Sequence, residues 1–386
     1  MKLIPKGSNK LTKVGKSLQI TNKLIKEIDS RELTYPDNFR CPIPDENFQK
    51  VLIEDYNIEV VDGTVAYKDV KGIEKFDCRE KEIQSLEGIE YFTALTILNC
   101  STNQLTSLDV SNNTALVVIN CWSNKLTSLN VSNNPALTYL GCGFNQLTSL
   151  DLSNKTALTE LYCSNNQLTS LDVSNNTALL VFWCGNNQLT SLDLSSNTFL
   201  ESLDCEENQL TSLDVSKNSA LTGLWCADNK LTTLDISNNT ALIELDCADN
   251  KLTSLNVSNN TAITELSCGR NELTTLDISN NTALTHLRCH NNKLNSLDVS
   301  KNTALKDLHC HNNQLTSLDV SKNTALTGLR CHNNQLTSLD VSKNTALTEL
   351  YCNKLTSLDC NNPKLKTVRL FSNPGDWWKE LEKDEL

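Results

Sequence analysis

Residues 116–136 read LVVINCWSNKLTSLNVSNNPA, and close variants of this stretch of 21 residues fill most of the chain. The first half follows the pattern L-x-x-L-x-C-x-x-N-x-L, with Leu116, Ile119, Cys121 and Asn124 at its fixed positions. The second half repeats this frame with a valine in place of the cysteine. Each repeat is therefore predicted to consist of two half-turns, each a short strand followed by a turn that carries asparagine.

The cysteines show how regular the repeat is. Thirteen of them follow one another at intervals of 21 residues, and Cys78 precedes the first of these by 22. A fixed period of about 20–29 residues with spaced leucines is typical of leucine-rich repeats, whose single units must stack to bury their apolar side. We therefore predict an α/β leucine-rich repeat solenoid of about 15 rungs, built mostly of short parallel β-strands and turns. The thirteen regularly spaced cysteines are Cys100, Cys121, Cys142, Cys163, Cys184, Cys205, Cys226, Cys247, Cys268, Cys289, Cys310, Cys331 and Cys352.

In such a rung the leucine, cysteine and valine side chains are predicted to point inward, while alternate residues point outward. Cysteines on neighbouring rungs would lie about 4.8 Å apart on parallel Cβ vectors, whereas a disulfide needs converging Cβ atoms about 3.8 Å apart. A linear column also cannot supply the four converging ligands of a zinc site. We expect the cysteines to act as small buried hydrophobes, with no cofactor and no metal. Cys360, in the valine column, is expected to do the same, and Cys41, outside the pattern, is the one candidate reactive thiol.

The two ends of the chain depart from the repeat. Residues 43–48 read IPDENF and predict a helix with Asp45 as its N-cap, with Phe48, Val51 and Leu52 facing inward. Residues 376–381 read DWWKEL and predict a short helix whose two tryptophans cover the last rung. The predicted organisation is a basic N-terminal tail or small module at 1–40, a helical N-terminal cap at 41–72, the repeat solenoid at 73–370 and a C-terminal cap at 371–386.

The cysteine in place of leucine and the unit of 21 residues resemble the bacterial cysteine-ladder repeats of the internalin type. Residues 83–92, which read IQSLEGIEYF, look like the first repeat that follows the N-terminal cap in that family. The resemblance covers about residues 43–370. It implies a leucine-rich repeat fold and non-enzymatic recognition of a host or cell-surface partner.

The repeats differ from one another mainly around the cysteine. The valine half is nearly constant, whereas the outward positions beside each cysteine vary in an aromatic, an acidic and a basic block. Exposed aromatic and arginine side chains on one rigid face are typical of binding hot spots, so we predict a partner-binding face along the cysteine-bearing strands. Its candidate residues are Trp122, Tyr139, Phe144, Tyr162, Trp183 and Trp225 in the aromatic block, Asp204, Glu206 and Asp246 in the acidic block, and Arg288, His290, His309, His311, Arg330 and His332 in the basic block.

Two further columns carry titratable side chains. Eleven aspartates recur in the constant half, interrupted by Asn130 and Asn256. We expect each aspartate to accept hydrogen bonds from nearby serine, threonine or turn N–H groups, with a calcium-binding face as the alternative. The histidines predict a patch whose positive charge depends on pH, because histidine titrates near about 6.5, with a shared metal ion as the alternative.

These features favour a non-enzymatic recognition scaffold that binds a protein, peptide or glycan partner as a monomer. A structural or adhesive spacer is an alternative, and so is calcium- or metal-assisted surface binding. The sequence contains no Ser-His-Asp or Cys-His pairing, phosphate loop or separate catalytic domain. The net charge of −12 argues against nucleic acid, whose phosphates attract clustered positive charge.

Targeting signals give little guidance. No run of about 18 apolar residues occurs, so no transmembrane segment is predicted. The first 26 residues carry seven lysines and no acid, but the apolar segment of a signal peptide does not follow them. We therefore expect a cytoplasmic location or leaderless export, with secretion or the cell surface as the alternative. Residues 383–386 read KDEL, like an endoplasmic-reticulum retention signal, and we interpret them as the charged end of the C-terminal cap.

Overall fold

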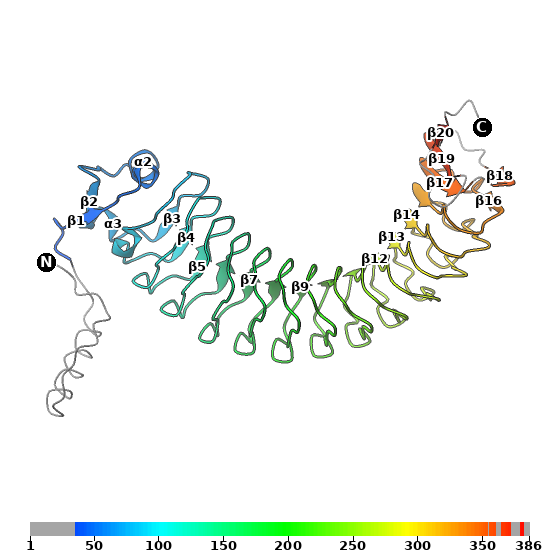
Figure 1. Cartoon of the computed structure of the whole chain (residues 1–386), viewed down its shortest axis with the longest axis horizontal. Coiled ribbons are helices and arrows are strands. Elements are labelled where there is room, and N and C mark those ends of the chain that lie inside the picture. The colour runs from blue at the N-terminus through cyan, green and yellow to red at the C-terminus, as the bar shows by residue number, and fades with distance from the viewer. Residues whose placement is uncertain (1–34, 354, 360–363, 372–378, 382–386) are drawn as a thin grey trace.

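The chain forms an arc of stacked turns, with a continuous β-sheet along its concave side (Figure 1). The structure is a computed structural model. Cys360, the two tryptophans predicted for the C-terminal cap, the terminal KDEL and most of the predicted basic tail lie outside the described residues. The described residues are 35–353, 355–359, 364–371 and 379–381.

One sheet of sixteen strands runs through the described chain, and all of its strands except the last are parallel. The fifteen parallel strands match the predicted number of rungs. Equivalent residues pair in register, so that Leu224 lies beside Leu245 and Trp225 beside Asp246. Because successive side chains of a strand alternate, the leucines of all rungs face one side and the variable residues face the other. The parallel strands are β3 (Lys75–Asp77), β4 (Ile97–Asn99), β5 (Val118–Asn120), β6 (Tyr139–Gly141), β7 (Glu160–Tyr162), β8 (Val181–Trp183), β9 (Ser202–Asp204), β10 (Gly223–Trp225), β11 (Glu244–Asp246), β12 (Glu265–Ser267), β13 (His286–Arg288), β14 (Asp307–His309), β15 (Gly328–Arg330), β17 (Glu349–Asn353) and β19 (Thr367–Phe371).

The inward side chains form a continuous apolar core along the arc. The predicted inward orientation of leucine, cysteine and valine is confirmed, as Leu224, Cys226 and Val215 show with 0% exposure. All fifteen described cysteines are buried. Cys41 is among them, and burial raises the pKa of its thiol to about 12. Its interpretation as a reactive thiol is therefore wrong, because reactivity requires an accessible thiolate.

A column of buried asparagines ties the cysteine half of each rung to the rung before it. The side chain of Asn124 accepts a hydrogen bond from Leu105 N at 3.0 Å. Its Nδ2 donates to Cys100 O and Cys121 O, both at 3.0 Å. These backbone groups would otherwise be buried without partners, so each asparagine stabilises the turn that carries it. The predicted ladder of asparagine side chains is confirmed.

The sequence predicted a second strand in the valine half of every rung, and most of the described valine halves do not form one. Its backbone closes in turns, in which Asn113 N donates to Val110 O at 3.1 Å. On the next rung Asn134 Nδ2 donates to the carbonyl oxygens of these two residues, at 2.9 Å and 3.1 Å. Side-chain donors thus occupy acceptors that a second β-ladder would use. Strands form in the described valine halves only near the C-terminal end, as β16 (Ser338–Asp340) and β18 (Ser357–Asp359).

The helix predicted after Asp45 is present as α2 (Glu46–Glu54), and the three side chains expected to face inward are buried. One carboxylate oxygen of Asp45 caps this helix by accepting from two backbone N–H groups, at 2.9 Å and 3.0 Å. The other oxygen accepts from Gln84 N and Ser85 N in the first repeat, at 2.8 Å and 3.0 Å. The remaining elements of this end are β1 (Arg40–Pro42), paired antiparallel with β2 (Thr64–Ala66), the helix α3 (Tyr67–Val70) and the 3₁₀ helix η1 (Ile89–Tyr91).

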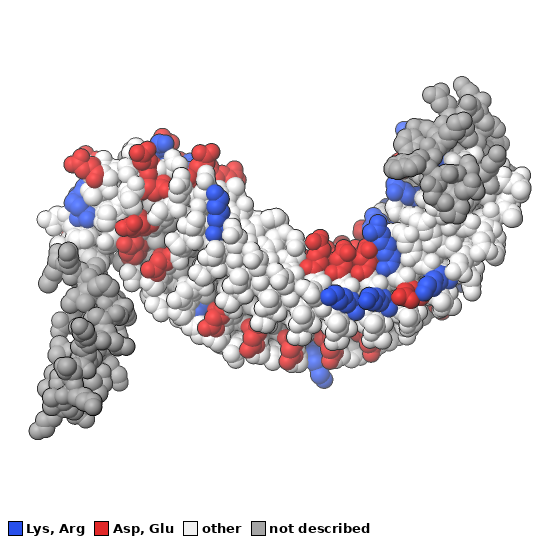
Figure 2. Space-filling view, in the orientation of Figure 1, with Lys and Arg blue, Asp and Glu red and all other residues white. Residues whose placement is uncertain are grey.

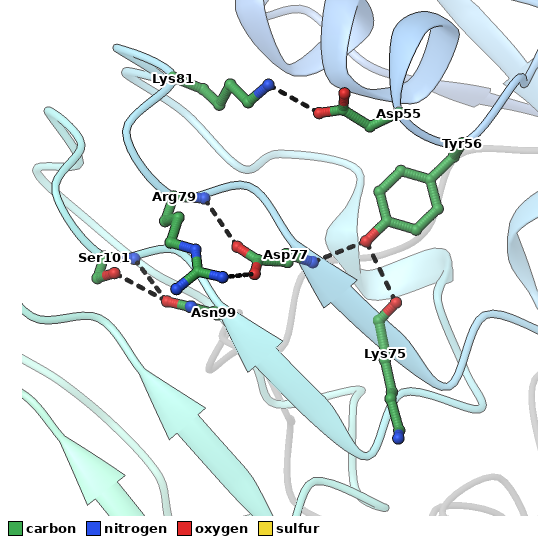
Figure 3. Close-up of polar contacts among 8 residues, drawn as sticks. All are labelled: Asp55, Tyr56, Lys75, Asp77, Arg79, Lys81, Asn99 and Ser101. Atoms are coloured by element: carbon green, nitrogen blue, oxygen red, sulfur yellow. Dashed lines mark hydrogen bonds and ion pairs between the residues drawn. The ribbon is translucent and has the colours of Figure 1, made fainter.

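Further polar contacts join the end of α2 to the first rung (Figure 3). The hydroxyl of Tyr56 accepts a hydrogen bond from Asp77 N at 2.7 Å and donates to Lys75 O at 3.4 Å. Lys81 forms an ion pair with Asp55 at 2.8 Å. The helix therefore covers the first strand through directed contacts as well as through its apolar face.

The C-terminal end differs from the predicted cap helix. The three described residues of that segment form a strand, β20 (Lys379–Leu381), which pairs antiparallel with β19. A strand in this place satisfies the backbone groups at the open edge of the sheet, which a helix would leave unpaired.

One rung breaks the asparagine column of the valine half. Lys155 occupies the position of Asn134 and Asn176 in the neighbouring repeats and is fully buried. Its Nζ contacts the side-chain oxygen of Asn154, and burial lowers the pKa of its amine. An asparagine here would instead donate to the backbone of the preceding rung, as Asn134 does.

We expect Lys155→Asn to raise the free energy of unfolding by about 1–3 kcal/mol, because it removes a buried amine and restores two ladder hydrogen bonds. Urea denaturation followed by circular dichroism measures the change. The reverse substitution, Asn197→Lys, is the matched control and should lower stability. A less stable Lys155→Asn variant would show that the lysine is better accommodated than the asparagine column implies.

Two neighbouring residues of β10 test the assignment of the faces. Leu224→Ala removes a fully buried side chain and should lower the free energy of unfolding by about 2–5 kcal/mol. Trp225→Ala, on the opposite side of the same strand, should lower it far less, because Trp225 is only half-buried. Equal losses in urea denaturation would mean that the two faces are assigned the wrong way round.

Candidate binding surface

Two rows of outward side chains follow the concave sheet, whose strands are drawn in Figure 1. The pre-cysteine row holds the residue just before each ladder cysteine, and the post-cysteine row holds the residue just after it. Tyr139 opens strand β6, and Phe144 is the second residue after Cys142. The structure thus brings all of the predicted residues to the concave side. The pre-cysteine row contains Tyr162, Trp183, Asp204, Trp225, Asp246, Arg288, His309 and Arg330, and the post-cysteine row contains Trp122, Glu206, His290, His311 and His332.

In each rung the backbone turns away from the concave face at one residue in a left-handed conformation. The second residue after the cysteine has a positive φ, as in Phe144 (52°), Asp228 (51°) and Asn291 (53°). Only asparagine, aspartate and glycine adopt this conformation at low cost, which explains the frequent asparagine at this position. The turn limits the variable surface to the strand and the two residues that follow its cysteine.

The aromatic residues form two clusters. The ring centroids of Trp122 and Phe144 lie 5.0 Å apart. Tyr162 lies 5.4 Å from Tyr139 and 5.1 Å from Trp183, the latter edge to face at 84°. Such pairs add stability beyond the area they bury and hold the rings in place. Phe144 and Trp183 remain 48% and 37% exposed, so both clusters present apolar surface to solvent.

Two glycines make room for indoles: Gly143 on the rung after that of Trp122, and Gly223 on the same strand as Trp225. A Cβ atom at Gly143 would lie 2.3 Å from the ring of Trp122, and one at Gly223 would lie 2.3 Å from the ring of Trp225. Both rings therefore pack against bare backbone. Sequence reasoning missed these glycines, although Gly143 occupies the position of Trp122 in the next repeat and Gly223 lies two residues before Trp225.

Acidic side chains gather near the middle of the concave surface (Figure 2). Burial raises the pKa of Asp204 and of Asp246. Burial, followed by the nearby charges of these two residues, raises the pKa of Glu206 to about 7. Partly desolvated carboxylates that also repel one another favour any partner that brings positive charge.

Basic side chains follow next along the arc. Arg288 and Arg330 flank His309 in the pre-cysteine row. The guanidinium of Arg330 lies 5.0 Å from the ring centroid of Tyr351, and His309 lies 3.2 Å from the carboxylate of Asp307. Sequence reasoning missed Tyr351 and Asp307. Both occupy outward strand positions, and Tyr351 belongs to the pre-cysteine row of the shortened final repeats.

Three histidines of the post-cysteine row form a stack. The ring centroids of His290 and His311 lie 4.7 Å apart, and those of His311 and His332 lie 4.6 Å apart, with nearly parallel planes. Burial, followed by the neighbouring histidines, lowers the pKa of His311 to about 3. Burial and Arg330 lower the pKa of His332 to about 4, and burial also lowers that of His290. The prediction of a patch that gains charge near pH 6.5 is therefore wrong for these three residues, which are neutral at neutral pH.

The aspartates of the constant half have the role predicted for them. Asp214 accepts a hydrogen bond from Ser216 N, and Asp235 accepts one from Ser237 N, both at 2.9 Å. Hydrogen bonds from the side chains and the backbone N–H groups of these serines lower the pKa of both carboxyl groups. Within the described part of the chain, no group of three or more His, Cys, Asp or Glu side chains is arranged to hold a metal ion.

The fold and the buried thiol column together define a leucine-rich repeat protein with a cysteine ladder. The family of leucine-rich repeats (two copies) matches residues 156–197, and the LVIVD repeat matches residues 224–247 and 268–288. The functional domain of internalin J from Listeria monocytogenes, which includes a cysteine ladder, superposes with a TM-score of 0.75 and 37% identity over 84% of this chain and 78% of that chain. The chain belongs to the internalin family.

Two further comparisons show the extent of the similarity. Internalin J of Listeria monocytogenes serotype 4b (strain F2365) is 39% identical over 77 residues, which are 20% of this chain and 8% of that relative. The crystal structure of the internalin InlF from Listeria monocytogenes strain 4b F2365 has a TM-score of 0.75 at 24% identity, over 84% of this chain and 98% of that chain, and supports the fold alone. In the residues that the structure describes, no helix has the length and apolar character needed to cross a membrane.

The histidine stack gives a test of the local environment. We expect the ring resonances of His311 and His332 to titrate well below pH 6 in proton NMR, since burial favours the neutral imidazoles. Below about pH 6.5 the histidines of the unfolded chain bind protons, whereas the same histidines in the folded protein stay neutral. The free energy of unfolding is therefore expected to fall as the pH is lowered from about 6.5 toward 4. The variant His311→Gln/His332→Gln should lose less stability than the wild type between pH 6.5 and 4.5. Titration midpoints near 6.5 would contradict the buried stack.

Proposed function

We propose that the chain is a non-enzymatic recognition scaffold that binds a protein partner through its concave face. The observation that carries this proposal is the contrast between the two halves of each rung. The valine half repeats nearly the same residues, and its aspartates and buried asparagines form hydrogen bonds with the backbone of the constant half. The cysteine half varies from rung to rung and presents half-exposed aromatic and charged side chains on one rigid sheet.

The arrangement of the concave face suits protein recognition. Rigid aromatic side chains lose little entropy on binding, and Trp183 and Phe144 are already held by ring contacts. Arginines next to aromatic rings, such as Arg330 beside Tyr351, are frequent among residues that dominate binding energy. The separation of acidic and basic blocks along the arc would fix the direction in which a partner lies.

The experiment compares charge reversal on the two faces of the same rungs. A partner is isolated by photo-crosslinking from a residue of the concave sheet and identified, and its affinity is then measured with purified components. We expect Arg288→Glu/Arg330→Glu to weaken binding by about tenfold or more. The matched control is Lys301→Glu/Lys322→Glu, which makes the same charge change at exposed positions of the constant half.

Circular dichroism melting verifies that both double variants fold. Equal affinity of the two variants would place the binding site outside the basic block. Full-length protein that yields no crosslinked partner from any concave position would favour a structural or adhesive spacer.

A further inference from the structure

Tryptophan and aspartate alternate on four successive strands of the concave sheet. In the pre-cysteine row Trp183 pairs with Asp204, Asp204 with Trp225, and Trp225 with Asp246. Neighbouring parallel strands lie about 4.8 Å apart, so Asp204 stands directly between two indole-bearing positions. Glu206 lies two residues beyond Asp204, in the post-cysteine row.

The two indoles are held in place but have no cationic partner. Trp183 donates from Nε1 to Ser202 Oγ at 3.0 Å and is 37% exposed. The ring of Trp225 packs against Gly223, where a Cβ atom would come within 2.3 Å of it. Among the described residues, cations lie over the rings of Tyr67 and Tyr351 but not over either indole.

The carboxylates of this surface form no ion pair within the described chain. Asp204 and Asp246 each accept a hydrogen bond from a backbone N–H group two residues further on, at 3.0 Å. A hydrogen bond with the Ser267 side chain and the nearby charge of Arg288 also act on Asp246, but burial outweighs both and its pKa is still raised. Within the described chain, no basic side chain comes within 4.0 Å of Asp204, Glu206 or Asp246. The raised pKa values of all three show that their negative charge is partly desolvated and crowded. In the constant half, by contrast, hydrogen bonds to serine lower the pKa of aspartates such as Asp214.

The neighbouring strands confine this negative charge. On the C-terminal side the same row continues with Ser267 and Arg288, and then with His309 and Arg330. A cation placed further along the row would meet these guanidinium groups and be repelled. On the N-terminal side the row continues with Tyr162, which packs edge to face against Trp183. A cationic group is therefore favoured only across β8 to β11.

Resting on the proposed function, we propose that Trp183, Asp204, Glu206, Trp225 and Asp246 form a docking site for a positively charged segment of the protein partner. A lysine or arginine side chain of that segment lies against the indole faces and pairs with the carboxylates. Tryptophan is the strongest aromatic partner for a cation, and arginine both stacks on aromatic rings and binds carboxylates in a bidentate manner.

A segment of the same chain is the competing occupant, because residues 1–26 carry seven lysines and no acid. The course of the described chain favours an external partner. Tyr35, the first described residue, packs against Phe39 and Tyr91 at the N-terminal end of the arc. It lines a hollow together with Leu108 and Asp109 of the constant half. The chain therefore enters the arc beside the constant half, away from the concave surface of β8 to β11.

The test uses the full chain and a fluorescent hexa-arginine peptide with blocked ends, whose affinity is measured by fluorescence anisotropy. We expect Asp204→Asn/Glu206→Gln to weaken binding by about tenfold, because charge-assisted hydrogen bonds are lost. Trp183→Leu, which keeps apolar bulk and removes the aromatic face, should weaken it by about threefold. The matched control is Asp214→Asn/Asp235→Asn, which removes the same charge from the constant half and should change affinity less than about twofold.

Equal weakening by the concave and constant variants would overturn the proposal, because the peptide would then respond to net charge alone. So would a rise in affinity of about fivefold or more when Lys10, Lys13, Lys16 and Lys23 are replaced by glutamine in the full chain. That result would identify the basic N-terminal segment as the occupant.

Competition separates this inference from the proposed function. Excess hexa-arginine should displace a partner that has been captured through the concave face. If Arg288→Glu/Arg330→Glu abolishes partner binding while hexa-arginine neither binds nor competes, the proposed recognition function is supported and the proposed docking of a positively charged segment is wrong. If hexa-arginine binds as expected but no concave variant affects a captured partner, the proposed function is wrong in placing that partner here.

Discussion

The stacking of rungs in the described chain depends on hydrogen bonds from buried asparagine side chains to the backbone of the preceding rung. A turn this tight buries backbone N–H and C=O groups that neither water nor its own short strand can reach. The side chain of Asn124 accepts one hydrogen bond from such groups and donates two to them, and Asn134 donates two in the valine half. Because the side chain must reach atoms a fixed number of residues earlier, the unit is held at one length. The unbroken interval of 21 residues between cysteines is the visible result.

The two halves of the rung are joined to their neighbours by different hydrogen bonds, and the curvature of the arc follows from that difference. The cysteine half forms a parallel β-ladder, which sets the spacing of neighbouring strands at about 4.8 Å. Most of the valine half closes in turns that are tied by asparagine, so no continuous ladder imposes that spacing on it. The sheet therefore lies on the concave side (Figure 1). Outward side chains of neighbouring rungs lie close together on this side, because the strands that carry them pair in register. Crowding of like groups on this face contributes to the high pKa of Glu206 and the low pKa of His311.

Acidic side chains also have different roles in the two halves of the rung: those of the constant half stabilise turns, and a group on the concave face is free to meet a partner. Aspartates such as Asp214 and Asp235 cap their own turns through serine N–H groups, and exposure to water weakens their mutual repulsion. Asp204, Glu206 and Asp246 are instead half-buried near the indoles of Trp183 and Trp225, without a basic neighbour in ion-pair range in the described chain. The net charge of −12 therefore says little about binding, because many of the acids that produce it are used in the fold. What distinguishes the concave face is its unsatisfied charge beside exposed aromatic surface.

The sequence by itself determined the repeat, the inward leucine and cysteine columns, the asparagine ladder, the helix after Asp45 and the face on which variable residues lie. These features follow from local spacing, because identical units stacked in register must place equivalent residues side by side. Only the tertiary structure decided the burial of Cys41, the turns of the valine half, the strand at 379–381, the neutral histidine stack and the glycines beneath Trp122 and Trp225. Each of these depends on which groups from neighbouring rungs or from the caps surround a residue. Those neighbouring groups set the desolvation and the packing of each residue, and the spacing of residues along the chain does not specify which groups they are.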